Sequence, residues 1–187
     1  MSFQASAIVL ADSTFTPAHW FSKGEPQRLT TFQLTYPRMV HGELLTHRAF
    51  SRNASSSRAI PVKALSAFAE QELVYPIRWG VNQPGMQASL LNLSEEDQKE
   101  AHAVWQYMAE TCLEGVRRLG ELGLHKQWAN RPLEWFSNIR VVLTTTQAGL
   151  DHFMGLRDSL QAQPEIQDLA QAMRSALSTS VPRELEP

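Results

Sequence analysis

The chain has 187 residues, a length that suits one domain with a single hydrophobic core. Its net charge of −2 argues against a general nucleic-acid or membrane-surface binder, because such proteins are usually basic. One cysteine cannot form an intramolecular disulfide framework or a cysteine-rich zinc site, and we expect neither an export signal nor a membrane span. These features predict a cytoplasmic protein with no membrane or nucleic-acid partner.

The first third of the chain predicts two strands and a short helix. Residues 5–11 are a short apolar run, and residues 29–36 place β-branched and aromatic side chains on alternating faces. Residues 14–27 between them contain two prolines and a glycine, which predict a loop. Pro37 ends the second strand and suits the first turn of a helix that continues to Leu45.

The middle third predicts two helices on either side of an irregular segment. Pro61 begins the first helix, and residues 75–93 contain prolines and glycines that predict a loop long enough to be functional. Ser94 and Asp97 have the spacing of a capping box and begin a helix that continues to about Leu119. The predicted apolar stripe of this helix comprises Ala101, Val104, Trp105, Met108, Cys112, Val116 and Leu119.

The last third predicts a short helix, a strand and two longer helices. The short helix covers residues 124–130, and the β-branched run at residues 139–145 predicts a central strand. One helix ends near Arg157, another begins at Pro164, and the tail after Ser180 is expected to fray.

Together these elements predict a single α/β (α+β) domain over residues 1–187. It would have a small mixed or antiparallel sheet and several long helices, because strands and helices do not alternate regularly enough for a doubly wound sheet.

Residues 46–58, THRAFSRNASSSR, carry the most functional information. Arginine and histidine alternate there with serine and asparagine, and almost nothing in the segment could form a core face. Hydroxyl, amide and guanidinium groups are suited to holding phosphates and the edges of a nucleotide base. The segment therefore predicts a polar loop held by a scaffold.

This loop resembles the signature of flavin-dependent thymidylate synthases, in which Arg-His-Arg is followed by a serine, an asparagine, a second serine and an arginine. The matching positions here are His47, Arg48, Ser51, Asn53, Ser56 and Arg58. Residues 153–167, FMGLRDSLQAQPEIQ, resemble the closing motif of the family, with Arg157, Gln163 and Glu165 at its characteristic positions. Residues 126–134 resemble a stretch that carries another nucleotide-binding arginine, here Arg131, with an offset of one residue from Asn130.

The resemblance extends over residues 29–173 and implies a specific enzyme. It implies an FAD-dependent methyltransferase that converts dUMP to dTMP, with methylenetetrahydrofolate as carbon donor, NADPH as reductant and a homotetrameric assembly with FAD between subunits. The flavin-binding residues would be His47, Arg48 and Asn53. The nucleotide-binding residues would be Ser56, Ser57, Arg58, Arg131 and Arg157.

Two of these residues, Arg157 and Ser56, are the expected catalytic residues. Arg157 would polarise the pyrimidine by hydrogen bonding, whereas Ser56 is given no covalent role. Gln163 and Glu165 would hold Arg157 and the start of the last helix in place.

The sequence departs from the family pattern at four places. Thr46 replaces the first arginine of the triplet, Ala54 replaces a glutamate, and Gln161 stands where a histidine is common. Residues 23–28, KGEPQR, replace a histidine-containing segment upstream of the first motif.

Two other functions compete with dTMP synthesis. One is a flavin enzyme that adds another one-carbon unit to a pyrimidine nucleotide, and the other is a nucleotide-binding relic without catalysis. Structural interpretations of single residues also compete, because His47 and Arg48 could simply follow a helix end and the serines could form a flexible turn. Cys112 is expected to be an inert core residue, and the spacing of the histidines predicts no metal site.

Overall fold

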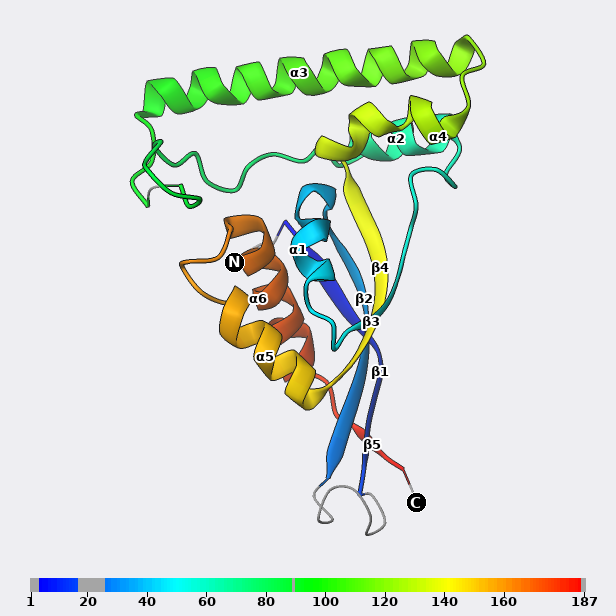
Figure 1. Ribbon diagram of the computed structural model, residues 1–187, viewed down its shortest axis with the longest axis vertical. Coiled ribbons are helices and arrows are strands. Elements are labelled where there is room, and N and C mark those ends of the chain that lie inside the picture. The colour runs from blue at the N-terminus through cyan, green and yellow to red at the C-terminus, as the bar shows by residue number, and fades with distance from the viewer. Residues whose placement is uncertain (1–3, 17–25, 89, 186–187) are drawn as a thin grey trace. The chain divides into compact units, whose positions relative to one another are not determined.

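The computed structural model describes residues 4–16, 26–88 and 90–185, and the chain folds into two compact units (Figure 1). The first unit comprises Met1–Tyr36, Gly42–Ala54 and Arg140–Pro187. The second comprises Pro37–His41 and Ser55–Ile139.

A mixed five-stranded sheet organises the first unit, with the strand order β3-β4-β2-β1-β5. Strands β1 (Ser6–Phe15) and β2 (Gln27–Pro37) are antiparallel, as are β3 (Ser51–Ala54) and β4 (Asn138–Thr146). The short β5 (Arg183–Glu184) pairs parallel to β1. This sheet confirms the predicted α/β class.

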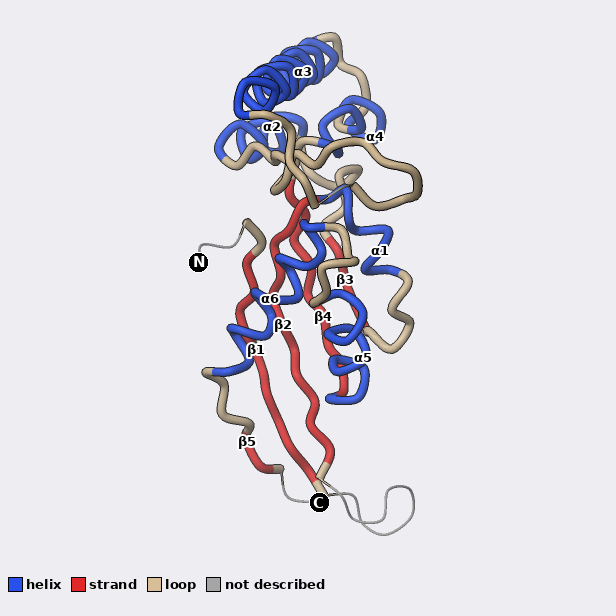
Figure 2. Tube along the Cα trace, turned by 90° about the vertical axis from the view of Figure 1, so that its left-hand side faces the viewer, coloured by secondary structure: helices blue, strands red, loops and turns tan. Residues whose placement is uncertain are grey.

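Helices α5 (Gln147–Arg157) and α6 (Pro164–Ser178) lie against one face of this sheet (Figure 2). The alternation in β2 explains the contact, because one set of its side chains is buried and the other set is more exposed. The buried core residues from the strands and helices include Phe32, Leu34, Tyr36, Leu143, Leu150, Phe153, Ile166, Leu169 and Met173.

The second unit is helical. It contains η1 (Arg38–Val40), α2 (Val62–Gln71), the 27-residue α3 (Glu95–Glu121), α4 (Lys126–Ala129) and η2 (Arg131–Trp135). Its core is a cluster of Ala69, Leu113, Val116 and Leu133, against which Val62 and Cys112 pack partly buried.

The structure confirms Ser94 as the predicted N-cap of α3. The Ser94 hydroxyl accepts a hydrogen bond from the backbone N–H of Asp97 at 3.1 Å, and it donates to the Asp97 carboxylate at 2.7 Å. The three acidic residues in the first turn are stabilised by the positive end of the helix dipole. The predicted stripe is only partly right, however, because Val104 and Met108 are exposed whereas Ala109 and Leu113 are buried.

Two predictions of irregular structure were wrong. Ser51–Ala54, inside the predicted polar loop, forms the edge strand β3, because its backbone pairs with β4 and polar side chains are tolerated at a sheet edge. Residues 181–185, which were expected to fray, are held by β5 and by a hydrogen bond from Leu185 N to Thr14 O at 2.8 Å. The Ser180 hydroxyl just before them donates to Asp12 at 2.7 Å.

The boundaries of the other predicted elements agree with the structure or differ from it by a few residues. The helix after Pro37 is present as η1 followed by α1 (His41–Leu45), and α5 ends at Arg157 as predicted. The predicted loop at residues 14–27 begins later, because β1 continues to Phe15; residues 17–25, including part of KGEPQR, lie outside the described residues. No helix within the described ranges is long and apolar enough to cross a membrane. The assignment of residues 1–187 to one domain stays a prediction.

Gly149 in α5 offers a test of the packing in the first unit. A Cβ added there would lie 2.5 Å from Thr145 Oγ1 and 3.2 Å from Ala49 Cβ. We expect Gly149→Ala to lower the free energy of unfolding by about 1–2 kcal/mol, because overpacking costs more than helix propensity returns. Gly155→Ala in the same helix meets nothing within 4 Å and should raise it by about 0.5–1 kcal/mol. Urea unfolding of both variants measures the difference, and equal effects would contradict the described packing.

Candidate functional site

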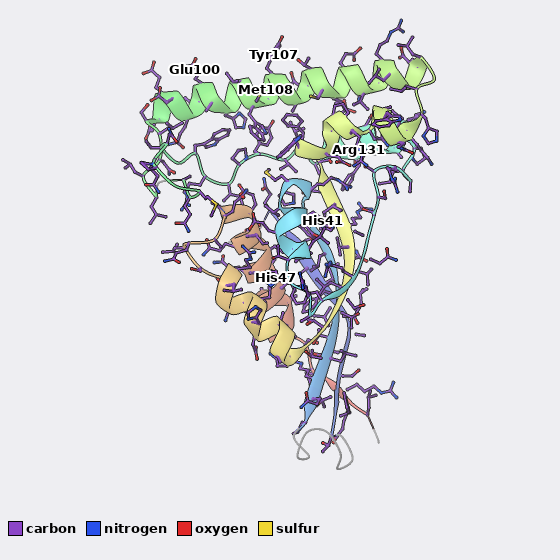
Figure 3. The ribbon with its side chains drawn as sticks, viewed as in Figure 1. His41, His47, Glu100, Tyr107, Met108 and Arg131 are labelled. Atoms are coloured by element: carbon purple, nitrogen blue, oxygen red, sulfur yellow. The ribbon has the colours of Figure 1, made fainter. Side chains whose placement is uncertain are left out.

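The candidate residues divide between the two units, because the boundary crosses the signature segment between Ala54 and Ser55. The first unit holds His47, Arg48, Asn53 and Arg157. The second unit holds Ser56, Ser57, Arg58 and Arg131. Figure 3 labels one member of each group, His47 in the turn that follows α1 and Arg131 at the start of η2.

His47 is buried in a tight turn after α1. Its backbone N–H donates to Leu44 O at 3.2 Å, and its carbonyl accepts from Phe50 N at 3.1 Å. The imidazole is only 6% exposed; it stacks on Phe50 with ring centroids 5.6 Å apart and meets the edge of Phe153 at 4.9 Å. Aromatic packing therefore fixes a ring that the sequence suggested only as part of a polar loop.

Arg157, at the end of α5, points its guanidinium at this turn. Its Nε donates to His47 Nε2 at 3.0 Å, and its Nη1 donates to Glu43 Oε2 at 2.9 Å. Its Nη2 donates to Thr46 Oγ1 at 3.4 Å. The structure thus joins Arg157 of one motif to His47 of the other, which are 110 positions apart.

The environment of His47 sets its protonation state. Burial lowers the pKa of His47 to about 4, and the positive charges of Arg157, His152 and Arg52 act in the same direction. The imidazole is therefore neutral at pH 7. Because Nε2 accepts the hydrogen bond from Arg157, the proton is assigned to Nδ1.

Arg52 stabilises the turn and was not singled out by the sequence analysis. Its guanidinium donates to the carbonyl oxygens of Leu45, His47 and Phe50 at 3.0, 3.2 and 2.8 Å. A cation that follows a helix end closely is a sequence signal for this role, since it can bond the last carbonyl groups. The direction of the Arg52 side chain, however, depends on strand β3, which was not predicted.

Arg48 and Asn53 present exposed polar side chains in the same unit. Arg48 makes no hydrogen bond or ion pair with any residue that the structure describes. Asn53 lies on β3 opposite Val142. Both side chains can therefore offer their donors to a ligand.

In the second unit, Glu134 joins two of the predicted nucleotide-binding residues. The Ser57 hydroxyl donates a short hydrogen bond to Glu134 Oε1, and Arg131 Nη1 donates to both Glu134 oxygens at 2.9 and 3.2 Å. Ser57 is buried, whereas Arg131 is half exposed. Glu134 thereby orients Arg131, and it already accepts the hydrogen bond that the Ser57 hydroxyl can donate.

Three donors hold the backbone of the serine-rich segment from the side. The amide of the fully buried Asn130 donates to Ser57 O at 2.7 Å and to Ile60 O at 2.9 Å. Lys126 donates to Ala59 O at 2.8 Å, and Arg38 donates to Ser55 O at 3.4 Å. These contacts fix the backbone of a segment that the serines alone would suggest is a flexible turn.

The exposed face of this segment carries Ser56 and Arg58. The backbone N–H of Arg58 donates to Ser56 Oγ at 3.3 Å, and Ala59 N donates to Ser56 O at 2.9 Å. Both residues are exposed, so this hydrogen-bonded turn offers a hydroxyl and a guanidinium to solvent. This pairing suits an anionic oxygen such as that of a phosphate.

Gln163 and Glu165 occupy the start of α6. The Gln163 amide donates to Glu165 Oε2 at 2.9 Å, and Pro164 takes the first position of the helix. The hydrogen-bond partners of Arg157 come instead from α1 and the turn after it.

Cys112 is half-buried beside the core cluster of the second unit. In the described part of the chain, no group of three or more His, Cys, Asp and Glu side chains could hold a metal ion.

Comparison with known families identifies the chain. The family model of Thy1, described as thymidylate synthase complementing protein, matches residues 27–183. The chain therefore belongs to this family. No curated protein sequence matches the chain significantly.

Solved structures share the fold at low sequence identity. A UMP/dUMP methylase, PolB from Streptomyces cacaoi bound with 5-Br UMP, has a TM-score of 0.69 at 17% identity over 93% of this chain and 88% of that one. The same methylase bound with 5-Br dUMP has a TM-score of 0.66 at 22% identity over 81% and 67%. The flavin-dependent thymidylate synthase ThyX from Helicobacter pylori, complexed with FAD and dUMP, has a TM-score of 0.55 at 23% identity over 80% and 67%.

The low pKa of His47 predicts a pH-dependent stability. Because the pKa is lower in the folded chain than its ordinary value of 6.5, the unfolded state binds more protons between pH 6.5 and about 4. The contribution of neutral His47 is complete above pH 6.5 and is lost as the pH falls towards 4. We expect the free energy of unfolding of His47→Gln, which cannot titrate, to fall less over this range than that of the wild type. Parallel urea titrations at several pH values measure this, and identical pH profiles would contradict it.

Proposed function

We propose that the protein is a flavin-dependent thymidylate synthase. It would convert dUMP, methylenetetrahydrofolate, NADPH and a proton to dTMP, tetrahydrofolate and NADP⁺. When bound, FAD would supply the redox chemistry that links NADPH to the one-carbon transfer, and the protein would supply binding, orientation and electrostatics.

One observation carries this proposal: Arg157 and His47, from the two separate family motifs, are hydrogen-bonded at 3.0 Å. A surface loop and an unrelated helix end have no reason to meet in this way. Membership of the Thy1 family over residues 27–183 supports the same function.

The residues assigned to the flavin have suitable chemistry. Arg48 offers an unpaired guanidinium to an electron-rich ring, and Asn53 offers an exposed amide. His47 would contribute a neutral, aromatically packed imidazole rather than a cation. With Thr46 in place of the first family arginine, Arg48 is the cation of this triplet that would face the flavin.

The residues assigned to the nucleotide would contact different parts of it. Ser56, Arg58 and Arg131 would bind phosphate and sugar oxygens, with Glu134 orienting Arg131. Ser57 would support this segment through its bond to Glu134. Arg157 would hydrogen-bond the pyrimidine and stabilise charge that develops on it, a role that its three fixed partners suit.

A second candidate is methylation of UMP as well as dUMP. The structural neighbours with the higher TM-scores are described as a UMP/dUMP methylase, bound with 5-Br UMP and 5-Br dUMP. Addition of a different one-carbon unit to the pyrimidine is a variant of the same chemistry. We propose a homotetrameric, cytoplasmic enzyme in each case.

Absorption spectroscopy and product analysis test these candidates together. We expect added FAD to acquire a bound-flavin spectrum that dUMP perturbs. Mass spectrometry of reactions with dUMP or UMP, methylenetetrahydrofolate and NADPH should then show dTMP as the main product. A larger yield of methylated UMP would favour the second candidate, and absence of flavin binding would favour a nucleotide-binding relic.

Arg157→Gln tests the role of the arginine in turnover. We expect kcat/KM for dUMP to fall by at least about a hundredfold, because electrostatic stabilisation by one fixed donor is commonly worth that much. FAD should stay bound, since Arg157 is assigned to the nucleotide.

Cys112→Ala is the control, because the flavin route needs no cysteine nucleophile and this thiol packs against a core cluster. It should keep near-normal turnover. Near-normal turnover in Arg157→Gln, or a folded but inactive Cys112→Ala, would contradict the proposal.

A further inference from the structure

Glu43 is the carboxylate partner of Arg157, and no sequence motif pointed to it. Glu43 lies in α1, and its Oε2 accepts from Arg157 Nη1 at 2.9 Å. The two side chains are 32% and 21% exposed, so the pair is shielded from solvent more than a surface ion pair is.

Arg157 keeps two donors for a ligand. A guanidinium has five N–H groups, and here one each is directed at His47, Glu43 and Thr46. One N–H on each terminal nitrogen bonds to none of the described residues. These two donors can reach a partly open surface, because the side chain is not fully buried.

Glu43 offsets the positive charge of Arg157 itself, and the pKa of His47 keeps its imidazole neutral at pH 7. The neighbouring Arg52 keeps its charge, but its guanidinium donates to three carbonyl groups of the turn. The neighbouring Asp158 is bound to Arg174 at 2.7 Å and accepts from Gln171 at 3.1 Å. By contrast, Arg48 and Arg58 are exposed and form no ion pair with any carboxylate in the described ranges.

We propose that Glu43 is a specificity-determining residue that makes Arg157 select an uncharged, carbonyl-bearing ring over an anion. A neutralised guanidinium still donates hydrogen bonds to carbonyl oxygens, but it offers little net attraction to phosphate. Where the ring is the uracil of the nucleotide, this inference rests on the proposed function. Glu43 then ensures that the base, and not the phosphate, occupies Arg157.

Glu43→Gln separates the charge from the contact. The glutamine oxygen can still accept from Arg157 Nη1, while the negative charge is lost. We expect inorganic phosphate, used alone as the probe, to bind Glu43→Gln about tenfold more tightly than the wild type, a modest effect for a freed and partly buried cation. Isothermal calorimetry measures this affinity without any nucleotide or flavin.

Two comparisons locate the effect. The gain should disappear in the double variant Glu43→Gln/Arg157→Gln, because the freed guanidinium is its source. Glu70→Gln is the matched control, since Glu70 pairs with Arg117 at 2.6 Å in a more exposed ion pair and should bind phosphate like the wild type. Unchanged phosphate affinity in Glu43→Gln, or a gain that persists in the double variant, would overturn the proposal. Glu43→Ala provides a second variant if Glu43→Gln does not fold.

Bound 5-fluoro-dUMP gives a second readout that a merely structural role would not move. A 5-fluoro group acidifies the ring N3–H, and ultraviolet titration reports its ionisation. In Glu43→Gln the bound ring should ionise at lower pH than in the wild type, because the unpaired guanidinium stabilises the ring anion. An identical ionisation in both proteins would overturn the role of Glu43 towards the base. If the wild type binds no dUMP, the proposed function fails, while the phosphate measurement still decides whether Glu43 excludes anions.

Discussion

The hydrogen bond from Arg157 to a neutral His47 is the interaction around which the polar site of the first unit is arranged. A protonated imidazole 3.0 Å from the guanidinium would repel it, so the geometry requires burial to keep the ring uncharged. Phe50 and Phe153 provide that burial, and Arg52 fixes the turn by bonding three of its carbonyl groups. Apolar packing thereby determines where the positive charge of Arg157 is directed.

In the second unit, polar side chains fix the backbone of the serine-rich segment. A run of serines has a high conformational entropy, yet here buried and half-buried donors fix its backbone. The fully buried Asn130 bonds two of its carbonyl groups, and Glu134 takes the Ser57 hydroxyl. The backbone that carries the exposed Ser56 and Arg58 is therefore ordered before a ligand binds, which removes the backbone part of the entropic cost of binding.

Local signals in the sequence predicted most of the fold, whereas contacts between distant residues did not follow from it. Pro37, Ser94 and Pro164 mark helix starts because their effects act within one turn, and the alternation in residues 29–36 predicted β2 and its buried face. Strands β3 and β5 escaped prediction because both are short edge strands whose formation depends on a partner strand. The motifs located His47 and Arg157, but nothing local could show that Glu43 pairs with Arg157 or that the Arg52 side chain is directed at the turn.

The most direct test of this account is the protonation state of His47, observed by ¹⁵N NMR of the histidine side chains at pH 7. We expect a neutral ring with the proton on Nδ1 and an unprotonated Nε2 that accepts from Arg157, and we expect Arg157→Gln to change the Nε2 signal. A protonated His47, or a proton on Nε2, would contradict the arrangement from which the role of Arg157 is derived.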